Sequence, residues 1–257
     1  MKKIILILIG LTLVSCDFVK KQNKSKFDNI SEKDTTCLND ITDAKFDIQK
    51  GKLVYCYNLG SITHHSLRSE EELTSILKQI NIEFRNVASS DIDYENQTHC
   101  YCEFMKEKIT EKYGEKIIDS ILVLSEKLYL KNSINDTLYY ADCDKRPNYP
   151  NDNSEYQGEF SEVLQNELEK KITYPKGYIK KPNRNFSAFV DIYFYVNKKG
   201  EAKIQSFWFN FDIKTNNKFK NYLESEIKKY IKTENWTPAQ IIGENVNSDM
   251  NLRFYLK

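Results

Sequence analysis

The chain has 257 residues, of which 40% are hydrophobic, 29% charged and 13% aromatic, and its 38 basic and 37 acidic residues leave a formal charge of +1. Only eight glycines and five prolines, beside 17 tyrosines and 14 phenylalanines, exclude a collagen-like chain and general disorder. The balanced charge gives no overall attraction to nucleic acid, so we expect no nucleic-acid partner. The length fits one or two domains.

The N-terminus has the layout of a secretory signal. Two lysines precede an apolar run over residues 4–14, which is too short for a membrane-spanning helix of about 20 apolar residues. The run ends in Leu13-Val14-Ser15-Cys16, which resembles the lipobox of bacterial lipoproteins. The resemblance implies that residues 1–15 are a cleaved signal peptide and that Cys16 carries fatty acyl chains such as palmitate. The alternative is an ordinary signal peptide with a cysteine at its end.

Acyl chains on Cys16 would anchor the protein to the inner or the outer membrane of the cell envelope and leave its body in the periplasm. No later segment reaches a membrane-spanning length, so we expect the lipid to be the only membrane attachment. Loss of the signal removes two lysines and no acid, which lowers the formal charge to −1. Residues 16–36 are polar and predict a lipidated flexible tether.

The rest of the mature chain divides into two expected domains. Residues 147–154 belong to a polar, proline-containing stretch, which predicts a linker between an N-terminal domain over 37–146 and a C-terminal domain over 155–257. Both domains mix helical and strand patterns, so the predicted fold class is α+β.

The N-terminal domain shows strand patterns at 53–57 and 82–84, and three helical patterns between residues 69 and 128. Ser69 and Glu72 have the spacing of a capping box at the start of the first helix. Residues 138–140 predict a strand that closes this domain. The domain resembles no family that we identify.

The C-terminal domain is more regular. Apolar side chains follow a helical spacing from Phe160 to Ile172, and they alternate along 186–196 and 250–256 as expected for strands. A turn at 197–200 and a returning strand at 204–211 predict a hairpin with Gly200 at a positive φ, and a second helix follows from Phe219 to Ile231. The predicted order is helix, strand, strand, helix, strand, with a three-stranded antiparallel sheet.

This order and several short motifs resemble the TonB C-terminal domain family, in the short form found in lipoproteins of the Bacteroidetes. The motifs are YQGEF at 156–160, ITYP at 172–175, FYVNKKGEAKIQSF at 194–207, WTPA at 236–239 and MNLRFYL at 250–256. Single residues carry this fold signature: Gly158, Tyr174, Pro175, Gly200, Trp236, Pro238 and Gly243. We interpret them as residues that maintain the fold, for example Pro175 as the end of a helix and Trp236 as the cover of one sheet end.

The resemblance implies a module that binds an envelope protein or peptide, linked to TonB-type transport across the outer membrane. A TonB energy transducer has an uncleaved membrane helix and a proline-rich arm, and this chain has a cleavable signal and only five prolines. We therefore expect a non-catalytic binding or scaffolding lipoprotein without a cofactor. Strand addition at an exposed sheet edge is the expected binding mode.

Five cysteines remain once Cys16 is acylated: Cys37, Cys56, Cys100, Cys102 and Cys143. Export favours disulfides, and an odd number leaves at most two bridges and one thiol, with fifteen possible pairings. We favour one bridge near Cys56 and Cys143, because both lie at predicted strands. His99, Cys100 and Cys102, with His64 and His65, are candidate metal ligands, although Cys-x-Cys is not the usual spacing of structural zinc.

Two other functions stay open at this stage. No nucleophile-elbow, dinucleotide-binding, phosphate-loop or zinc-protease motif occurs. One alternative is nevertheless an envelope enzyme, or a metal- or thiol-binding protein, with its site in 37–146. The other is a lipid-anchored energy transducer of the TonB type.

Overall fold

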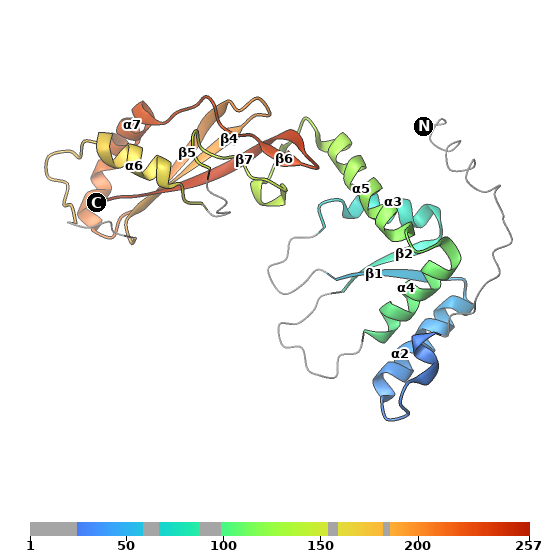
Figure 1. Ribbon diagram of the computed structural model, residues 1–257. Coiled ribbons are helices and arrows are strands. Elements are labelled where there is room, and N and C mark those ends of the chain that lie inside the picture. The colour runs from blue at the N-terminus through green and yellow to red at the C-terminus, as the bar shows by residue number, and fades with distance from the viewer. Residues whose placement is uncertain (1–24, 59–66, 88–98, 154–158, 182–185) are drawn as a thin grey trace.

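The structure of the chain is a computed structural model that describes residues 25–58, 67–87, 99–153, 159–181 and 186–257. It is a mixed α+β protein, as predicted, with an N-terminal body of helices around two short strands and a C-terminal body built on a larger sheet (Figure 1). The signal, residues 16–24 of the predicted tether, the His64–His65 pair and Gly158 lie outside the described residues. The rest of the stretch predicted as a flexible tether belongs to the N-terminal body, because Phe27 packs edge to face on Phe104 and a helix begins at Thr35.

The N-terminal body contains a parallel strand–helix–strand unit. Its elements are η1 (Lys26–Asn29), α2 (Thr35–Gln49), β1 (Leu53–Asn58), α3 (Glu70–Gln79), β2 (Ile82–Val87), α4 (Cys100–Tyr113) and α5 (Ile117–Ser133). Strands β1 and β2 pair in parallel from Leu53 opposite Ile82 to Asn58 opposite Val87, and α3 is the crossover between them. Helix α4 packs on β1 and α2, and α3 packs on β2 and α5. The predicted strands and the three predicted helices are confirmed.

The predicted capping box at Ser69 is wrong. Ser69 lies at the N-cap of α3 but makes no side-chain cap bond. Its hydroxyl is fully buried, 2.8 Å from Glu126 Oε1 and 3.2 Å from Ser125 Oγ on α5. A tertiary contact with α5 has replaced the local one, because a buried hydroxyl needs a partner wherever the packing supplies it.

Two disulfides join the first turn of α4 to its neighbours. Cys100 is bonded to Cys37 on α2, and Cys102 is bonded to Cys56 on β1. Cys143 keeps a free thiol, so the bridge favoured near Cys56 and Cys143 is wrong. Two bridges and one thiol agree with the odd number of cysteines. Each bridge closes a long loop of the unfolded chain and stabilises the fold by about 2–4 kcal/mol.

The C-terminal body is a sheet covered by two helices on one face (Figure 1). Its elements are β3 (Thr137–Leu138), η2 (Tyr140–Asp142), α6 (Glu162–Lys171), β4 (Phe189–Val196), β5 (Ala202–Asn210), η3 (Lys214–Phe219), α7 (Lys220–Tyr230), β6 (Ala239–Ile241) and β7 (Glu244–Tyr255). The strand order is β3-β7-β4-β5, and β6 forms a hairpin with β7. Strands β4, β5 and β7 are the three predicted antiparallel strands, but β3 and β6 enlarge the sheet beyond the prediction.

Alternation along the strands separates the two faces of this sheet. The even-numbered side chains of β4, from Val190 to Val196, are fully buried against α6 and α7. Leu164 and Leu168 of α6 and Leu223 of α7 are also fully buried on this face. Each such side chain stabilises the fold by about 1.5–3 kcal/mol relative to exposure to water.

The stretch predicted as a linker packs against the C-terminal body. Lys145 pairs with Gln240 of β6, and Asn148 pairs with Thr237. Tyr149 is buried beside Trp236, with ring centroids 5.4 Å apart, and its hydroxyl lies 3.1 Å from Glu167 Oε2. The strand predicted to close the N-terminal domain is β3, and it pairs with β7 of the other body. Neither pairing is visible locally, because the partners are about a hundred residues away.

The signature residues of the C-terminal domain have structural roles. Tyr174 packs on Tyr178 and accepts a hydrogen bond from the amide of Lys257, 3.0 Å away. Pro175 lies just beyond the end of α6, and Pro238 immediately precedes β6. Trp236 covers Phe194, with ring centroids 4.8 Å apart. Gly243 adopts φ +79° in the turn between β6 and β7.

Gly200 has the positive φ predicted for it, +80°, and a second constraint as well. Its carbonyl accepts a hydrogen bond from the amide of Trp236, and a Cβ on Gly200 would lie 2.2 Å from the Trp236 carbonyl oxygen. Gly51 has a similar φ of +77°, but a Cβ there would meet nothing within 4 Å.

We therefore expect Gly200→Ala to destabilise the protein more than Gly51→Ala. The left-handed backbone costs about 1–2 kcal/mol with a side chain at either site, and only Gly200 adds an overlap with the Trp236 carbonyl. Urea unfolding of both variants measures the difference. Equal losses of stability would contradict the close approach of the turn to Trp236.

Candidate binding surface

Three of the candidate metal ligands, His99, Cys100 and Cys102, lie in the described residues. Cys100 and Cys102 are consumed by disulfides, and His99 lies at the N-cap of α4. Within the described ranges, no three His, Cys, Asp or Glu side chains are placed to hold a metal ion.

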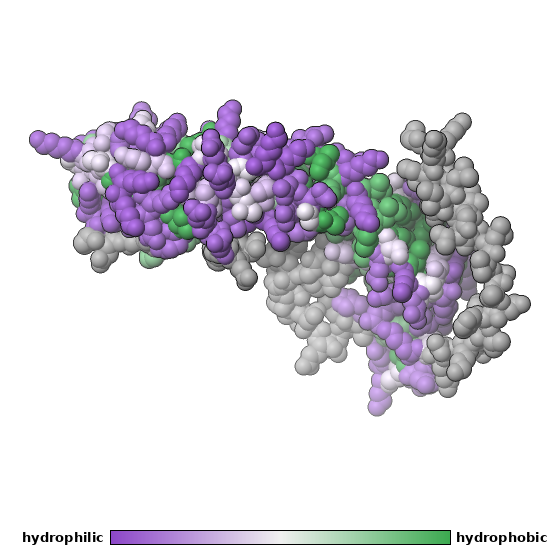
Figure 2. All heavy atoms as spheres, turned by 45° about the horizontal axis from the view of Figure 1, so that its top comes forward, coloured by the Kyte–Doolittle hydropathy of each residue, from purple (hydrophilic) through white to green (hydrophobic). Residues whose placement is uncertain are grey.

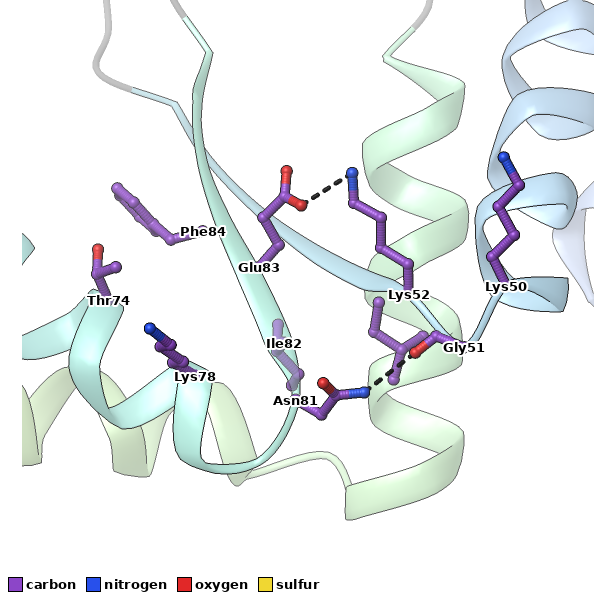
Figure 3. Close-up of a pocket in the computed structure, with 10 residues that line it drawn as sticks. Lys50, Gly51, Lys52, Thr74, Lys78, Asn81, Ile82, Glu83 and Phe84 are labelled. Carbon is purple, nitrogen blue, oxygen red and sulfur yellow. Dashed lines mark hydrogen bonds and ion pairs between the residues drawn. The ribbon is translucent and has the colours of Figure 1, made fainter.

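A hollow of about 450 Å³ lies where β1 and β2 begin (Figure 3). Lys52, which lines it, forms an ion pair with Glu83 at 2.8 Å, and the side-chain amide of Asn81 donates to the Gly51 carbonyl at 3.1 Å. Figure 3 shows Lys78 on one side of β2 and Lys50 on the other. These polar groups hold the two strand starts together, and they do not converge on one point as the groups of a ligand site do.

The C-terminal sheet leaves one long edge open. Strand β7 pairs with β4 on one side and with β3 and the short segment at Phe160 on the other, and its first residues pair with β6 in a hairpin. In the part of the chain that the structure describes, β5 has no strand beyond it. The exception is its first residue, Ala202, whose amide donates to the Thr233 carbonyl. The open edge therefore runs from Lys203 to Asn210.

The hydrogen-bond pattern identifies which β5 residues face this edge. The amides of Arg253 and Tyr255 on β7 point away from β4, since they donate to Glu159 O and Gln165 Oε1. Bonding alternates along antiparallel strands, so the β4 residues opposite them, Asp191 and Phe189, direct their N–H and C=O groups toward β5.

The β5 partners of Asp191 and Phe189 are Trp208 and Asn210, whose backbone groups therefore point inward to β4. By the same alternation, Phe207 and Phe209 direct their N–H and C=O groups outward to the open edge. A register shift between Tyr193 and Phe194 bends the ladder further along.

Aromatic side chains lie on the face of the sheet that α6 and α7 leave uncovered, and one of them, Trp208, is on the edge strand β5. Trp208 is 52% exposed and packs on Phe189, with ring centroids 5.6 Å apart. Tyr193 and Phe186 are also exposed, and Phe186 contacts Tyr255 edge to face. This row of rings on a rigid sheet is an apolar surface next to unpaired backbone groups.

An ion pair holds the middle of the uncovered face. The Arg253 guanidinium donates to both carboxylate oxygens of Asp191, at 2.7 and 2.8 Å, and lies 3.9 Å from the centre of the Phe189 ring. These bonds hold the pKa of Arg253 above its ordinary value, although burial acts against them. Both charges are satisfied within the sheet, so the pair is a rigid support for the rings.

Arg68 links the two bodies. Its Nε donates to Glu126 Oε2 at 2.7 Å, and its Nη1 donates to the Asp142 carbonyl at 2.8 Å and lies 2.7 Å from Asp144 Oδ1. The other Asp144 oxygen accepts a hydrogen bond from the Ile242 amide at 2.6 Å. Burial would raise the pKa of Asp144, but the Ile242 amide and the Arg68 guanidinium outweigh it and keep that pKa below its ordinary value.

No helix in the described ranges has both the length and the apolar character needed to cross a bilayer. No protein-family model, curated protein or solved structure matches this chain.

The sequence indicated an open sheet with two edges, but it did not indicate which edge is available. The residues that cover β7 include β3 and Phe160, whose pairing is long-range and leaves no local pattern. The signal available in the sequence was the run Phe207-Trp208-Phe209. Because side chains alternate between the two faces of a strand, this run places one large ring, Trp208, on the face that α6 and α7 leave uncovered.

Cys143 offers a check on the junction between the bodies. It is the one cysteine outside the two disulfides among residues 25–257, and burial raises the pKa of its thiol to about 11. We expect a chain that starts at residue 17 to react with iodoacetamide at pH 8 roughly a hundredfold more slowly when folded than when unfolded without reductant. The folded rate should rise with pH up to about 11. More than one reactive thiol, or a folded rate that levels off near pH 8.5, would contradict this environment.

Proposed function

We propose that this chain is a cell-envelope lipoprotein whose C-terminal body binds an extended segment of another envelope protein at the open edge of β5. One observation carries the proposal: the backbone groups of Phe207 and Phe209 point outward from the edge, and the exposed ring of Trp208 lies between them in the chain. The role is binding or scaffolding, and it uses no catalytic residue and no cofactor.

The chemistry of the edge favours a peptide in extended conformation. An added strand gains backbone hydrogen bonds at Phe207 and Phe209, and each contributes about 0.5–1.5 kcal/mol net. Alternate side chains of the added strand would lie beside Trp208 on the uncovered face, where contact with the ring gives selectivity for apolar residues. The Asp191–Arg253 pair keeps the neighbouring strands rigid, so little order has to be gained on binding.

The N-terminal sequence supports the proposed location. An apolar run that ends in Leu13-Val14-Ser15-Cys16 supports lipidation of Cys16 and a body in the periplasm. Residues 17–25 are largely polar and would separate the lipid from the body, whose first packed ring is Phe27 of η1 on Phe104.

The resemblance of residues 155–257 to TonB C-terminal domains supports a partner from TonB-type transport across the outer membrane. The same comparison weakens the case for an energy transducer, because a cleaved and acylated N-terminus has no helix with which to reach a proton-driven motor. We therefore place the chain as a binding component beside such transport.

A peptide selection tests the proposal. Peptides selected by display against the chain from residue 17 should be extended and apolar at alternate positions, and on binding they should slow amide hydrogen exchange at Phe207 and Phe209. Trp208→Ala should weaken their binding by about tenfold, because the lost ring contact is worth about 1–1.5 kcal/mol.

Tyr222→Ala is the matched control, since Tyr222 is an exposed aromatic residue on α7, which covers the face of the sheet opposite to Trp208. It should leave the affinity unchanged. Peptides that protect other amides, or that bind Trp208→Ala and wild type equally, would count against the β5 edge as the binding site.

A further inference from the structure

Hydrophobic side chains gather on a second surface, where α5 meets the turn between β6 and β7 (Figure 2). We call it the α5–turn surface and define it by Val123, Leu124, Lys127, Leu130, Lys131 and Ile242. Val123 is 54% exposed, and Leu124 and Ile242 are each 43% exposed. This surface takes no part in the β5 edge.

The helix explains why these residues share one side. Positions 123, 127, 130 and 131 of α5 are spaced by four, seven and eight residues, so they lie along one stripe. Ile121 and Ser125 are on the opposite side and are buried in the body. The outward stripe is therefore apolar and cationic, although an outward stripe of a soluble body is ordinarily polar.

The stripe and the turn enclose an apolar notch of about 440 Å³. Its walls include Leu130, Ile134 and Ile242, and its rim carries the ammonium groups of Lys127 and Lys131 and one carboxylate, Glu244. The charge around the notch is net positive, which complements an anionic amphiphile.

The backbone at Ile242 gives an independent indication. Ile242 has φ +51° and Gly243 has φ +79°, so the turn has two successive left-handed residues. Such turns favour asparagine before glycine, and a β-branched residue is strained there. Because the Ile242 side chain is still 43% exposed, its packing beside Leu130 and Ile134 offsets only part of this strain. A half-exposed apolar side chain is thus held at the tip of a hairpin at a cost in backbone strain.

We propose that the α5–turn surface docks on an anionic phospholipid membrane. Val123, Leu124 and Ile242 enter the boundary between headgroups and acyl chains, and Lys127 and Lys131 contact the phosphates while their stems cover the apolar zone. A membrane fits better than a protein partner, because single apolar residues separated by lysines match an interfacial helix and do not form the continuous apolar core of a protein interface. This inference does not depend on binding at β5.

Vesicle sedimentation tests the proposal with the chain from residue 17. That chain keeps every described element and lacks the apolar run at 4–14, which would bind membranes by itself. We expect it to bind mixed phosphatidylcholine–phosphatidylglycerol vesicles, to bind pure phosphatidylcholine vesicles far less, and to be released as salt is raised.

The deciding variant is Ile242→Asn, because it should improve folding while it removes binding. Relief of the left-handed strain should raise the thermal midpoint by about 2–4 °C, and loss of the apolar tip should lower vesicle affinity by roughly tenfold. Ile179→Asn makes the same change at another exposed isoleucine and should leave vesicle binding unchanged. Lys127→Gln with Lys131→Gln should remove the preference for anionic vesicles.

Several results would overturn the proposal: equal vesicle binding by wild type and Ile242→Asn, no preference for anionic vesicles, or no vesicle binding at all. A dimer that Ile242→Asn dissociates would assign the surface to a second copy of the chain instead. Trp208→Ala should bind vesicles like wild type, so failure here is distinguishable from failure at the β5 edge.

Discussion

The C-terminal body depends on the pairing of β7 on both of its sides. This strand of twelve residues pairs with β4 along one side and with β3 and Phe160 along the other, and its first residues pair with β6. The fully buried side chains Phe254 and Leu256 come from it and its end, and Arg253 on its other face holds Asp191. Because β7 has strands on both sides and β3 at one edge is only two residues long, β5 is the long edge that the described residues leave open. The available edge is thus a consequence of how the last strand is paired.

The N-terminal body is held by different means. Its sheet has only two strands, which is too little for independent stability without helices and cross-links. Two disulfides fix the start of α4 to α2 and to β1, and the buried Ser69–Glu126 contact fixes α3 to α5. Helix α5 then extends to the junction, where Tyr129 and Leu130 pack on the cluster formed by Leu138, Ala239, Ile241 and Val246. Arg68 and Asp144 connect this junction to the amide of Ile242, so the α5–turn surface is built from both bodies.

Elements with a strong period were predictable from the sequence, and elements that depend on distant partners were not. Alternation predicted β4 and β7, and helical spacing predicted α3 to α7. Helix α2 was missed because its buried side consists of only Cys37, Ile41 and Ala44 in a largely polar segment. The short strands β3 and β6 depend on pairing with β7, which the local sequence does not show. The spacing of the cysteines likewise did not show that Cys143 lies at the junction with the C-terminal body, away from the four cysteines that form disulfides. At the candidate site the rings were visible in the sequence, whereas the edge beside them was not. The strain at Ile242 required the backbone angle.

The central claim is that β5 presents an unpaired edge next to Trp208, and amide hydrogen exchange measured by NMR tests it most directly. In the free chain, the amides of Phe207 and Phe209 should exchange much faster than those of Ser206 and Trp208, because only the latter pair with β4. Uniform protection of all four amides would contradict the account, since it would mean that another strand already covers the edge.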